Sequence, residues 1–267
     1  MEFLITHLSI LVVSASSVKM FKFASTPQNN SPLKIESLDI ILPCYNPPEN
    51  WADNAVFNFE ALEKELSLNL GIVIVNDGST MDLKDDFDLL KSRLSNLILI
   101  DEKRNSGKGS ALRKGVAHSK ADAVLLTDCD FPYQEESMLE VIACLKSGQA
   151  DIVAGVRNQE YYTHVPWFRK ALSKIYRRLL KRLIKLNITD TQCGLKGMNR
   201  KAISLFISTT TNRYLFDLEF LAMASRQGVL TIKPVLVNLK TGVTFSRMSP
   251  VVLITELINF FKIMLKT

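Results

Sequence analysis

The pair Asp128 and Asp130 is the first place where this sequence suggests chemistry. The two carboxylates flank Cys129, directly follow the apolar run Ala123–Thr127, and precede Pro132, which ends the expected strand. Open α/β sheets bind ligands beyond the carboxyl ends of their strands, and hard oxygen ligands there suit Mg²⁺ or Mn²⁺ held against a diphosphate. An ordinary polar turn explains the same residues about equally well, so the neighbouring loops must decide.

Two loops nearer the amino terminus carry groups that suit a nucleotide. Residues Pro43–Asn46 follow the apolar run Leu38–Leu42, and the ring of Tyr45 can stack on a base. Asp77 follows the apolar run Gly71–Val75 in an Asn-Asp-Gly-Ser turn, where its carboxylate can accept hydrogen bonds from a base or a ribose. Each loop alone is a good structural turn. Several such loops at one sheet edge favour a binding site.

A third loop, Asn105–Gly109, has the composition of a phosphate site. It follows the apolar run Leu97–Ile100 and opens an amphipathic stretch that ends near Val116. Backbone N–H groups at a helix start, together with the Lys108 ammonium, can hold a phosphate. A Walker-type P-loop is excluded, because Gly109 stands where Ser or Thr must bind Mg²⁺.

Apolar runs and amphipathic stretches alternate from residue 38 onwards. This order predicts an α/β fold with a mostly parallel, doubly wound sheet, whose strand ends bring the polar loops together. The expected strands are Leu38–Leu42, Gly71–Val75, Leu97–Ile100, Ala123–Thr127, Asp151–Ala154 and one near Ile232–Leu239. Expected helices include Pro166–Leu186, Phe216–Gln227 and Pro250–Lys266, besides those that link the strands.

The composition is that of a folded protein with free thiols. Of 267 residues, 47% are hydrophobic and 22% charged, which excludes global disorder. The four Cys lack a Cys-x-x-Cys spacing, so neither a zinc site nor a disulfide framework is favoured. Free thiols indicate a reducing, cytosolic setting.

Positive charge is concentrated in one stretch. The net charge is +6, and Arg169–Lys185 holds eight Lys or Arg and no acid. This favours a polyanionic partner, which leaves a membrane surface, a nucleic acid and a phosphate open. Phe168–Leu186 has the pattern of an amphipathic basic helix, which suits either anionic headgroups or an ordinary solvated surface. The helix Pro250–Lys266 fits either the membrane interface or the protein core.

The four polar loops, taken in order, resemble the family 2 inverting glycosyltransferases, which have the GT-A fold. The matching segments are Ile41–Asn46, Val75–Ser79, Asn105–Gly109 and Asp128–Asp130. Later segments resemble the branch that makes polyprenyl-phosphate sugars, such as dolichol-phosphate glucose and mannose synthases; these are Gly155–Arg157, Asp190–Lys196 and Phe216–Glu219. We therefore expect a catalytic domain over residues 37–245, a weakly structured extension over 1–36 and an amphipathic helix over 246–267.

The resemblance implies a role for each group of residues. The nucleotide-sugar donor, a UDP- or GDP-hexose, would contact Pro43, Tyr45, Asn46, Asp77, Gly107, Lys108 and Asp128. The metal, Mg²⁺ or Mn²⁺, would bind Asp128 and Asp130. The acceptor phosphate would contact Arg157, Arg169 and Ser173. The implied catalytic residues are Asp130, Arg157, Asp217 and Glu219.

Two positions depart from the family pattern. Many relatives have Asn-Glu after the Tyr, whereas this chain has Asn46-Pro47, and Glu49 could substitute. Close relatives often place Gln two residues after the second Asp, and here that residue is Pro132. The third metal ligand is therefore not assigned.

The type of acceptor follows from its acidity. A sugar hydroxyl needs a general base to become a nucleophile, whereas a phosphomonoester, with a second pKa of about 6, is already anionic and needs cations. Arg157 suits that need, although a structural Arg paired with a neighbouring acid is the alternative. Asp217 and Glu219 keep a base-dependent hydroxyl acceptor open, or serve as acids at a helix start.

The sequence thus predicts an enzyme on the membrane surface. It would transfer glucose or mannose from a nucleotide sugar to a polyprenyl or dolichyl phosphate, with inversion, on the cytoplasmic (inner) face and without nucleic acid. The alternatives are transfer to a polysaccharide or glycolipid hydroxyl, nucleotidyl transfer and a non-catalytic binding protein. A nucleotidyltransferase would need a Gly-rich loop where Pro43–Asn46 stands, and the Asp128 and Asp130 pair counts against a non-catalytic protein.

Overall fold

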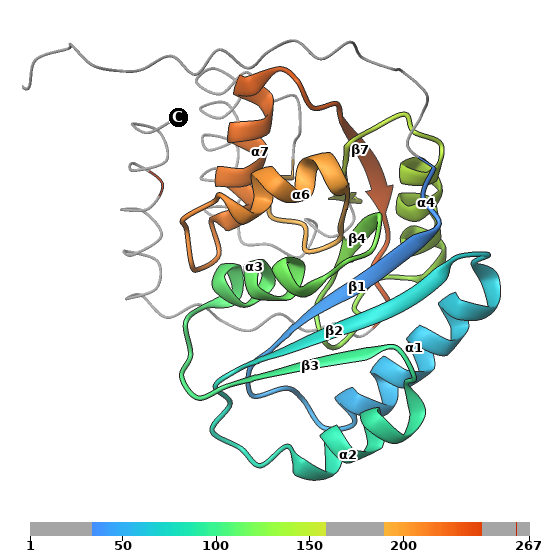
Figure 1. Ribbon diagram of the computed structural model, residues 1–267, viewed down its shortest axis with the longest axis vertical. Helices are drawn as coiled ribbons and strands as arrows, with labels where there is room; N and C mark the ends of the chain where they lie inside the picture. The colour runs from blue at the N-terminus through green and yellow to red at the C-terminus, as the bar shows by residue number, and fades with distance from the viewer. Residues whose placement is uncertain (1–33, 159–189, 242–259, 261–267) are drawn as a thin grey trace, which may run out of the picture. The chain divides into compact units, whose positions relative to one another are not determined.

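A seven-stranded sheet organises the chain (Figure 1). The computed structural model describes residues 34–158, 190–241 and 260. The strands lie in the order β3-β2-β1-β4-β6-β5-β7. Their bounds are β1 Ser37–Cys44, β2 Asn69–Asp77, β3 Leu97–Glu102, β4 Ala123–Leu126, β5 Ile152–Arg157, β6 Lys196–Asn199 and β7 Ile232–Val237.

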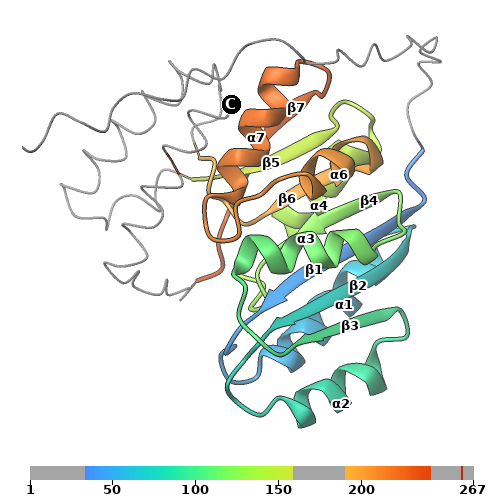
Figure 2. The same cartoon turned by 60° about the vertical axis from the view of Figure 1, so that its left-hand side comes forward.

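Helices cover both faces of this sheet (Figures 1 and 2). On one face, the apolar side chains of α1 (Trp51–Glu65), α2 (Lys84–Arg93) and α4 (Glu135–Lys146) form one core. On the other face, those of α3 (Lys108–His118), α6 (Arg200–Ile207) and α7 (Phe216–Gln227) form a second. Strands covered on both sides need continuous apolar runs, as in β1 and β2. The predicted doubly wound α/β architecture is confirmed.

One strand of the sheet was missing from the sequence prediction. β6 is antiparallel to β4 and to β5, while the other strand pairs are parallel. Its four residues, Lys-Gly-Met-Asn, show neither alternation nor β-branched side chains, so propensity does not mark them. Because β6 is antiparallel, Lys196 pairs with Leu126 at the end of β4. The segment 190–195 therefore reaches the carboxyl edge of the parallel strands.

Gly115 allows α3 to lie close to the sheet. A Cβ at this position would stand 2.6 Å from Cγ2 of Ile41, closer than real Cβ atoms pack, and 3.1 Å from Cγ2 of Val75. Glycine is the residue that permits such an approach. The close packing of α3 brings its first residue, Lys108, to the end of the sheet where β1 and β4 terminate.

Several predictions fall outside the described ranges. These are the basic helix over 166–186 with Arg169 and Ser173, the first 33 residues of the extension, and most of the C-terminal helix. Phe260 of that helix is described, and it is helical and buried in the core that contains α3 and α7. Within the described ranges, no helix has the length and hydropathy to cross a membrane.

Candidate active site

The polar loops meet where the strand order reverses. β1 and β4 are adjacent and parallel, with Ile41 opposite Leu126. The chain leaves β1 through α1 on one face and enters β4 from α3 on the other. Such a switch point is where open α/β sheets bind ligands. Asp128 and Asp130 follow β4 at this point, as predicted.

Asp128 lies between two loops that are distant in sequence. The ammonium of Lys108 forms an ion pair with Oδ1 of Asp128. Burial by itself would lower the pKa of Lys108, but the Asp128 carboxylate raises this pKa above its ordinary value. On the other side, a Cβ at Gly194 would stand 2.8 Å from Oδ2 of Asp128. A larger residue at position 194 would therefore displace the carboxylate.

Asp130 supplies a second carboxylate beside the first. Burial, followed by the charge of Asp128, raises the pKa of Asp130 above its ordinary value. Two crowded carboxylates favour a bound cation. Among the described residues no cluster of three or more His, Cys, Asp or Glu forms a metal cage. Two carboxylates suit Mg²⁺ or Mn²⁺, because these ions bind one or two carboxylates together with substrate phosphates.

Asp77 anchors the loop that precedes α3. Its Oδ1 accepts hydrogen bonds from the amide and the hydroxyl of Ser106, at 2.8 and 2.7 Å. Its Oδ2 accepts one from the amide of Gly107 at 2.7 Å. A carboxylate has about four acceptor positions, and three are used within the protein. The predicted contact of Asp77 with a base or ribose stays a prediction.

The start of α3 is also satisfied internally. The amides of Gly109 and Ser110 donate to the carbonyl of Asn212, at 2.8 and 3.2 Å. With the Gly107 amide bound to Asp77, these N–H groups are not offered to a ligand. Asn212 and Asp77 thus occupy these amides, and the phosphate contact expected of this loop stays a prediction. Lys108 keeps its place beside Asp128.

Tyr45 and Asn46 extend past the end of β1. The ring of Tyr45 is 48% exposed, as a base-stacking role requires. Asn46 has a φ of 46° and ties its loop to the loop after β2. Its side-chain Oδ1 accepts a hydrogen bond from the backbone amide of Thr80 at 2.8 Å. Its backbone amide donates a hydrogen bond to the Ser79 hydroxyl at 2.9 Å. Pro43 is half-buried within β1.

Arg157 forms a bidentate ion pair at the end of β5. Its Nε and Nη2 donate to the two carboxylate oxygens of Asp190, at 2.7 and 2.9 Å. Both side chains are largely buried. Burial would raise the pKa of Asp190, but the hydrogen bonds from Arg157 hold it below its ordinary value. The structure thus shows the pairing with an acid that was the alternative for Arg157, and the acceptor role stays a prediction.

The two acids at the start of α7 face different partners. Oδ1 of Asp217 lies 2.9 Å from Nζ of Lys196, whose side chain is completely buried. Burial raises the pKa of Asp217 despite this cation. The carboxylate of Glu219 accepts hydrogen bonds from the amides of Thr210 and Thr211, at 2.9 and 2.7 Å. Each acid thus has a partner within the protein, and the catalytic roles expected of Asp217 and Glu219 stay predictions.

Two contacts at this edge were not assigned from the sequence. The hydroxyl of Tyr133 accepts a hydrogen bond from the amide of Gly194 at 2.8 Å. Lys196 also donates to the carbonyl of Cys193. The first contact joins the loop after β4 to the 190–196 segment, and the second lies within that segment. The match of Asp190–Lys196 to one family branch was a signal for this segment, although it gave no role for Lys196.

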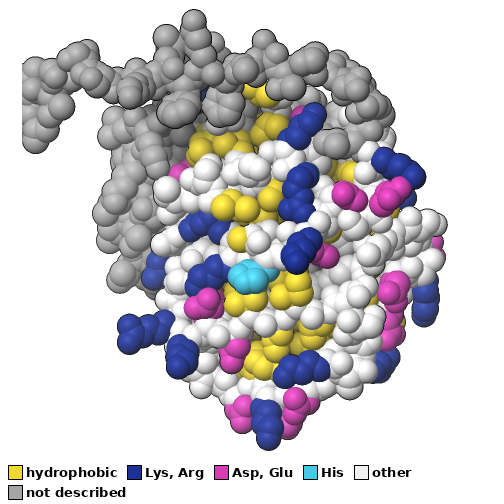
Figure 3. All heavy atoms as spheres, viewed as in Figure 1, with side chains coloured by type: hydrophobic (Ala, Val, Ile, Leu, Met, Phe, Trp, Pro, Cys, Tyr) yellow, Lys and Arg dark blue, Asp and Glu magenta, His cyan; other side chains and the backbone are white. Residues whose placement is uncertain are grey.

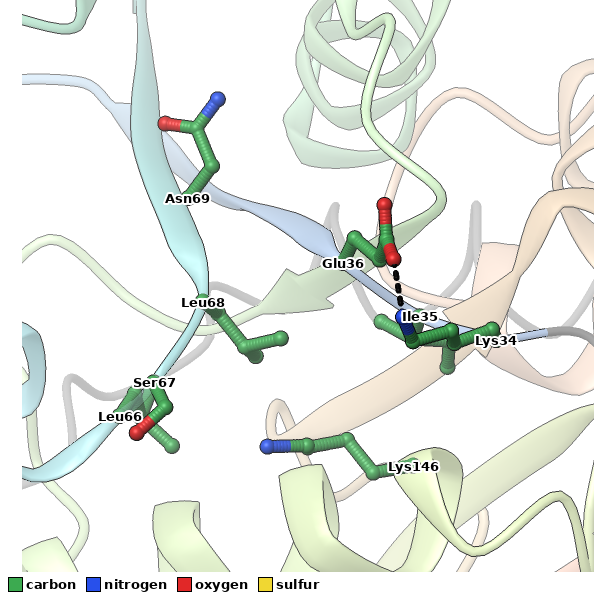
Figure 4. Close-up of a pocket in the computed structure, with 8 residues that line it drawn as sticks. All are labelled: Lys34, Ile35, Glu36, Leu66, Ser67, Leu68, Asn69 and Lys146. Carbon is green, nitrogen blue, oxygen red and sulfur yellow. Dashed lines mark ion pairs between the residues drawn. The ribbon is translucent and has the colours of Figure 1, made fainter.

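A cavity at the opposite end of the sheet is separate from this site (Figure 4). It measures about 660 Å³ and lies where β1 and β2 begin. It is lined by Lys34, Ile35, Glu36, Leu66, Ser67, Leu68, Asn69 and Lys146. No residue predicted for donor, metal or acceptor binding lines it.

On the molecular face in Figure 3, Lys and Arg side chains alternate with Asp and Glu and with small apolar patches.

Known proteins resemble this chain in sequence. Residues 39–206 match the family described as Glycosyl transferase family 2. A dolichyl-phosphate beta-glucosyltransferase of Dictyostelium discoideum is 28% identical, over 86% of this chain and 74% of the relative. A second protein of that name, from Trichomonas vaginalis, is 28% identical over 76% of this chain and 68% of its own length.

Solved structures share the fold. Glucosyl-3-phosphoglycerate synthase of Mycobacterium tuberculosis superposes with a TM-score of 0.57, at 18% identity, over 80% of this chain and 74% of that one. The same enzyme in complex with Mn²⁺ and UDP-glucose has a TM-score of 0.58 at 17% identity, over 82% and 74%. The likeness confirms the expected GT-A fold. Since the family match spans more than half of its residues, this chain belongs to glycosyl transferase family 2.

Proposed function

We propose that this protein transfers glucose from a uridine-diphosphate sugar to dolichyl phosphate, with inversion at the sugar. Two relatives that cover most of the chain carry the name dolichyl-phosphate beta-glucosyltransferase. The observation that carries the proposal is the placement of Gly194 against Asp128. Gly194 belongs to the segment that matches the lipid-phosphate branch, and Asp128 is one of the two carboxylates that we propose bind the metal.

On the donor side, the residues of this chain would bind and orient a diphosphate. Asp128 and Asp130 would hold Mg²⁺ or Mn²⁺, which neutralises charge on the leaving diphosphate when bound. The ammonium of Lys108 would bring a second positive charge to the same place once a metal takes over Asp128. Tyr45 would stack on the uracil ring. UDP-glucose and Mn²⁺ occur together in a structural neighbour, which supports this pairing.

On the acceptor side, the contacts of the acids favour a phosphate over a hydroxyl. A hydroxyl acceptor needs a carboxylate that is free to take its proton. Asp217 forms an ion pair with Lys196, and Glu219 accepts hydrogen bonds from the amides of Thr210 and Thr211. A phosphate needs no base. Its oxygen would attack the anomeric carbon from the face opposite the diphosphate, with Arg157, oriented by Asp190, close to its charge.

The place of the reaction follows from the acceptor. Dolichyl phosphate is a lipid, so the protein would work at a membrane surface, on the cytoplasmic face where nucleotide sugars and reduced thiols occur. The basic stretch Arg169–Lys185, with Arg169 and Ser173 near the acceptor, would meet anionic headgroups. Nucleic acid has no part in this proposal.

The test is a lipid-extraction assay. We would incubate the full chain with membranes containing dolichyl phosphate and with a panel of radiolabelled UDP- and GDP-hexoses. We expect label in the organic phase from UDP-glucose, and much less when Asp128→Asn replaces the native protein. Label that enters only water-soluble sugar or polysaccharide would overturn the lipid acceptor, and preference for a GDP-hexose would overturn the donor.

A further inference from the structure

A series of hydrogen-bonded polar side chains ends at the backbone carbonyl of Asp130. Nδ2 of Asn54 donates to the carbonyl oxygen of Asp130 at 2.6 Å. Asn58, one turn further along α1, donates its Nδ2 to Oδ1 of Asn54 at 2.8 Å. Nζ of Lys240, three residues past β7, donates to Oδ1 of Asn58 at 2.7 Å. The series thus connects three segments that are far apart in sequence.

The direction of each hydrogen bond follows from the ammonium at its end. Lys240 can only donate, so Asn58 must present its oxygen to it. Asn58 must then point its NH₂ group at Asn54, and Asn54 must present its own NH₂ group to Asp130. Because the Asp130 carbonyl can only accept, the two ends of this series require the same orientation of both amides, which delivers a donor to that carbonyl.

Stability of α1 does not explain this arrangement. Asn58 is only 4% exposed and lies on the face of α1 that forms the core with α4. An apolar residue such as Leu is a better helix former than Asn at such a position. A series of buried polar side chains destabilises a protein unless its members have hydrogen-bond partners. Asn54, Asn58 and Lys240 have such partners in one another, and the series ends on the loop that carries Asp130.

The loop it holds is strained. Phe131 is fully buried and has a φ of 47°, in the left-handed region that bulky residues avoid. The carbonyls on either side of Phe131 are both tied, the one of Asp130 to Asn54 and the one of Pro132 to the amide of Lys240 at 2.9 Å. Strain of this kind persists where neighbouring contacts hold it. Release of these contacts would let the Asp130 carboxylate move.

We propose that Asn54, oriented by Asn58 and Lys240, is a positioning residue that holds Asp130 in place for a divalent cation and the donor diphosphate. The inference rests on the proposed function, because it assumes that Asp130 binds the metal. It adds three residues that touch neither metal nor substrate. Mutation of a residue that hydrogen-bonds to a metal ligand, without touching the metal, usually lowers metal affinity by about 10- to 100-fold.

The first test is metal binding by the full-length protein. Electron paramagnetic resonance would measure Mn²⁺ affinity in the presence of UDP for native protein, Asn54→Leu and Asn58→Leu. We expect each variant to bind Mn²⁺ about 10- to 100-fold more weakly. The matched control is Asn199→Leu, because Asn199 caps α6 through the amides of Lys201 and Ala202 and is remote from the site. It should lower the melting temperature and leave Mn²⁺ affinity unchanged.

The second test uses the sign of a charge effect. Lys240→Met removes a positive charge whose field reaches Asp130, and this loss alone would tighten cation binding. Loss of the orienting donor would weaken binding. We expect weaker Mn²⁺ binding in Lys240→Met and partial recovery in Lys240→Arg, which keeps an N–H donor.

The outcomes separate the inference from the function on which it rests. Native protein that binds no Mn²⁺ with UDP would overturn the metal in the proposed function, and the inference with it. Native binding together with unchanged affinity in Asn54→Leu, or tighter binding in Lys240→Met, would overturn the inference alone. Should Asn54→Leu fail to fold, Asn58→Leu and Lys240→Met decide in the same way.

Discussion

The two ends of the same sheet use aspartate in opposite ways. At the amino end, Asp122 accepts hydrogen bonds from the amides of Glu36 and Ser37 and from the Ser37 hydroxyl. These hydrogen bonds lower the pKa of Asp122. At the carboxyl end, Asp130 is buried beside a second carboxylate, and its pKa is raised. The first arrangement stabilises the charged acid, whereas the second leaves it in need of a cation.

Other acids at the two ends of the sheet also differ in their partners. At the amino end, Asp39 accepts from the Ser119 hydroxyl at 2.6 Å, and Asp151 accepts from Asn199 at 2.8 Å. At the carboxyl end, Asp128 faces Lys108, and the buried Asp217 faces Lys196. Crowded charges in a cleft are typical of functional sites. Asp39 and Asp122 thus fasten their segments through neutral donors, whereas Asp128 and Asp217 are paired with cations.

The largest expected effect comes from the buried cation. Lys196→Met would leave Asp217 charged and buried without its partner, which typically costs about 3–5 kcal/mol of unfolding free energy. Denaturant unfolding measures this loss. The double variant Lys196→Met with Asp217→Leu should recover most of the stability, because no buried charge remains. A double variant as unstable as Lys196→Met alone would show that packing, not charge, sets the effect.

Removal of Asp130, the second carboxylate of the proposed metal site, should affect catalysis more than folding. We expect Asp130→Ala to lower the rate of lipid glucosylation on the order of a thousandfold, several kcal/mol of transition-state stabilisation, because metal and diphosphate lose their clamp. Its melting temperature should stay near the native value. Near-normal turnover of this variant in the presence of EDTA would contradict the metal site.

Substitution of Arg157 tests whether its ion pair with Asp190 serves the reaction or only the fold. Arg157→Ala should slow transfer to dolichyl phosphate by about ten- to a hundredfold, as loss of a charge-assisted contact worth roughly 1.5–3 kcal/mol implies. Donor affinity, measured by calorimetry with UDP, should hold. Arg157→Lys keeps the charge and serves as the control.

Another outcome is informative for this residue. Arg157→Ala also leaves Asp190 without its ion pair, so unfolding should be measured on the same sample. A fall in stability with unchanged transfer kinetics would make the pair structural, as at the amino end. A fall in UDP affinity would move Arg157 to the donor site.

The smallest effect is expected at the amino end and depends on pH. The folded state lowers the pKa of Asp122, so the charged acid stabilises the protein above its unfolded pKa, near 4, and this contribution is lost as the pH falls through the lower, folded value. Asp122→Asn should therefore reduce unfolding free energy at pH 7 by about 1 kcal/mol or less. Denaturant unfolding at pH 7 and pH 2 should show the difference shrinking at the lower pH. A difference that is constant with pH would mean that shape, not charge, matters.

Local patterns predicted most of the parallel sheet and the residues at its edge. Apolar runs such as Gly71–Val75 mark buried strands without any knowledge of their neighbours. Polar loops that follow such runs must lie at one edge when the strands are parallel, and this placed Asp77 and Asp128 correctly. Branch-specific motifs pointed to the segment Asp190–Lys196 before its position was known.

Pairings between distant segments were decided only by the tertiary structure. β6 forms because β4 and β5 leave a place between them, although its own four residues carry no strand pattern. Asn212 occupies the amides of Gly109 and Ser110, and Lys240 reaches Asn58 across 182 positions of sequence. Sequence spacing determines what lies on one strand or one helix face, because those periods are local. Which acid meets which cation depends on how the elements pack, and that is determined by contacts between residues far apart in the chain.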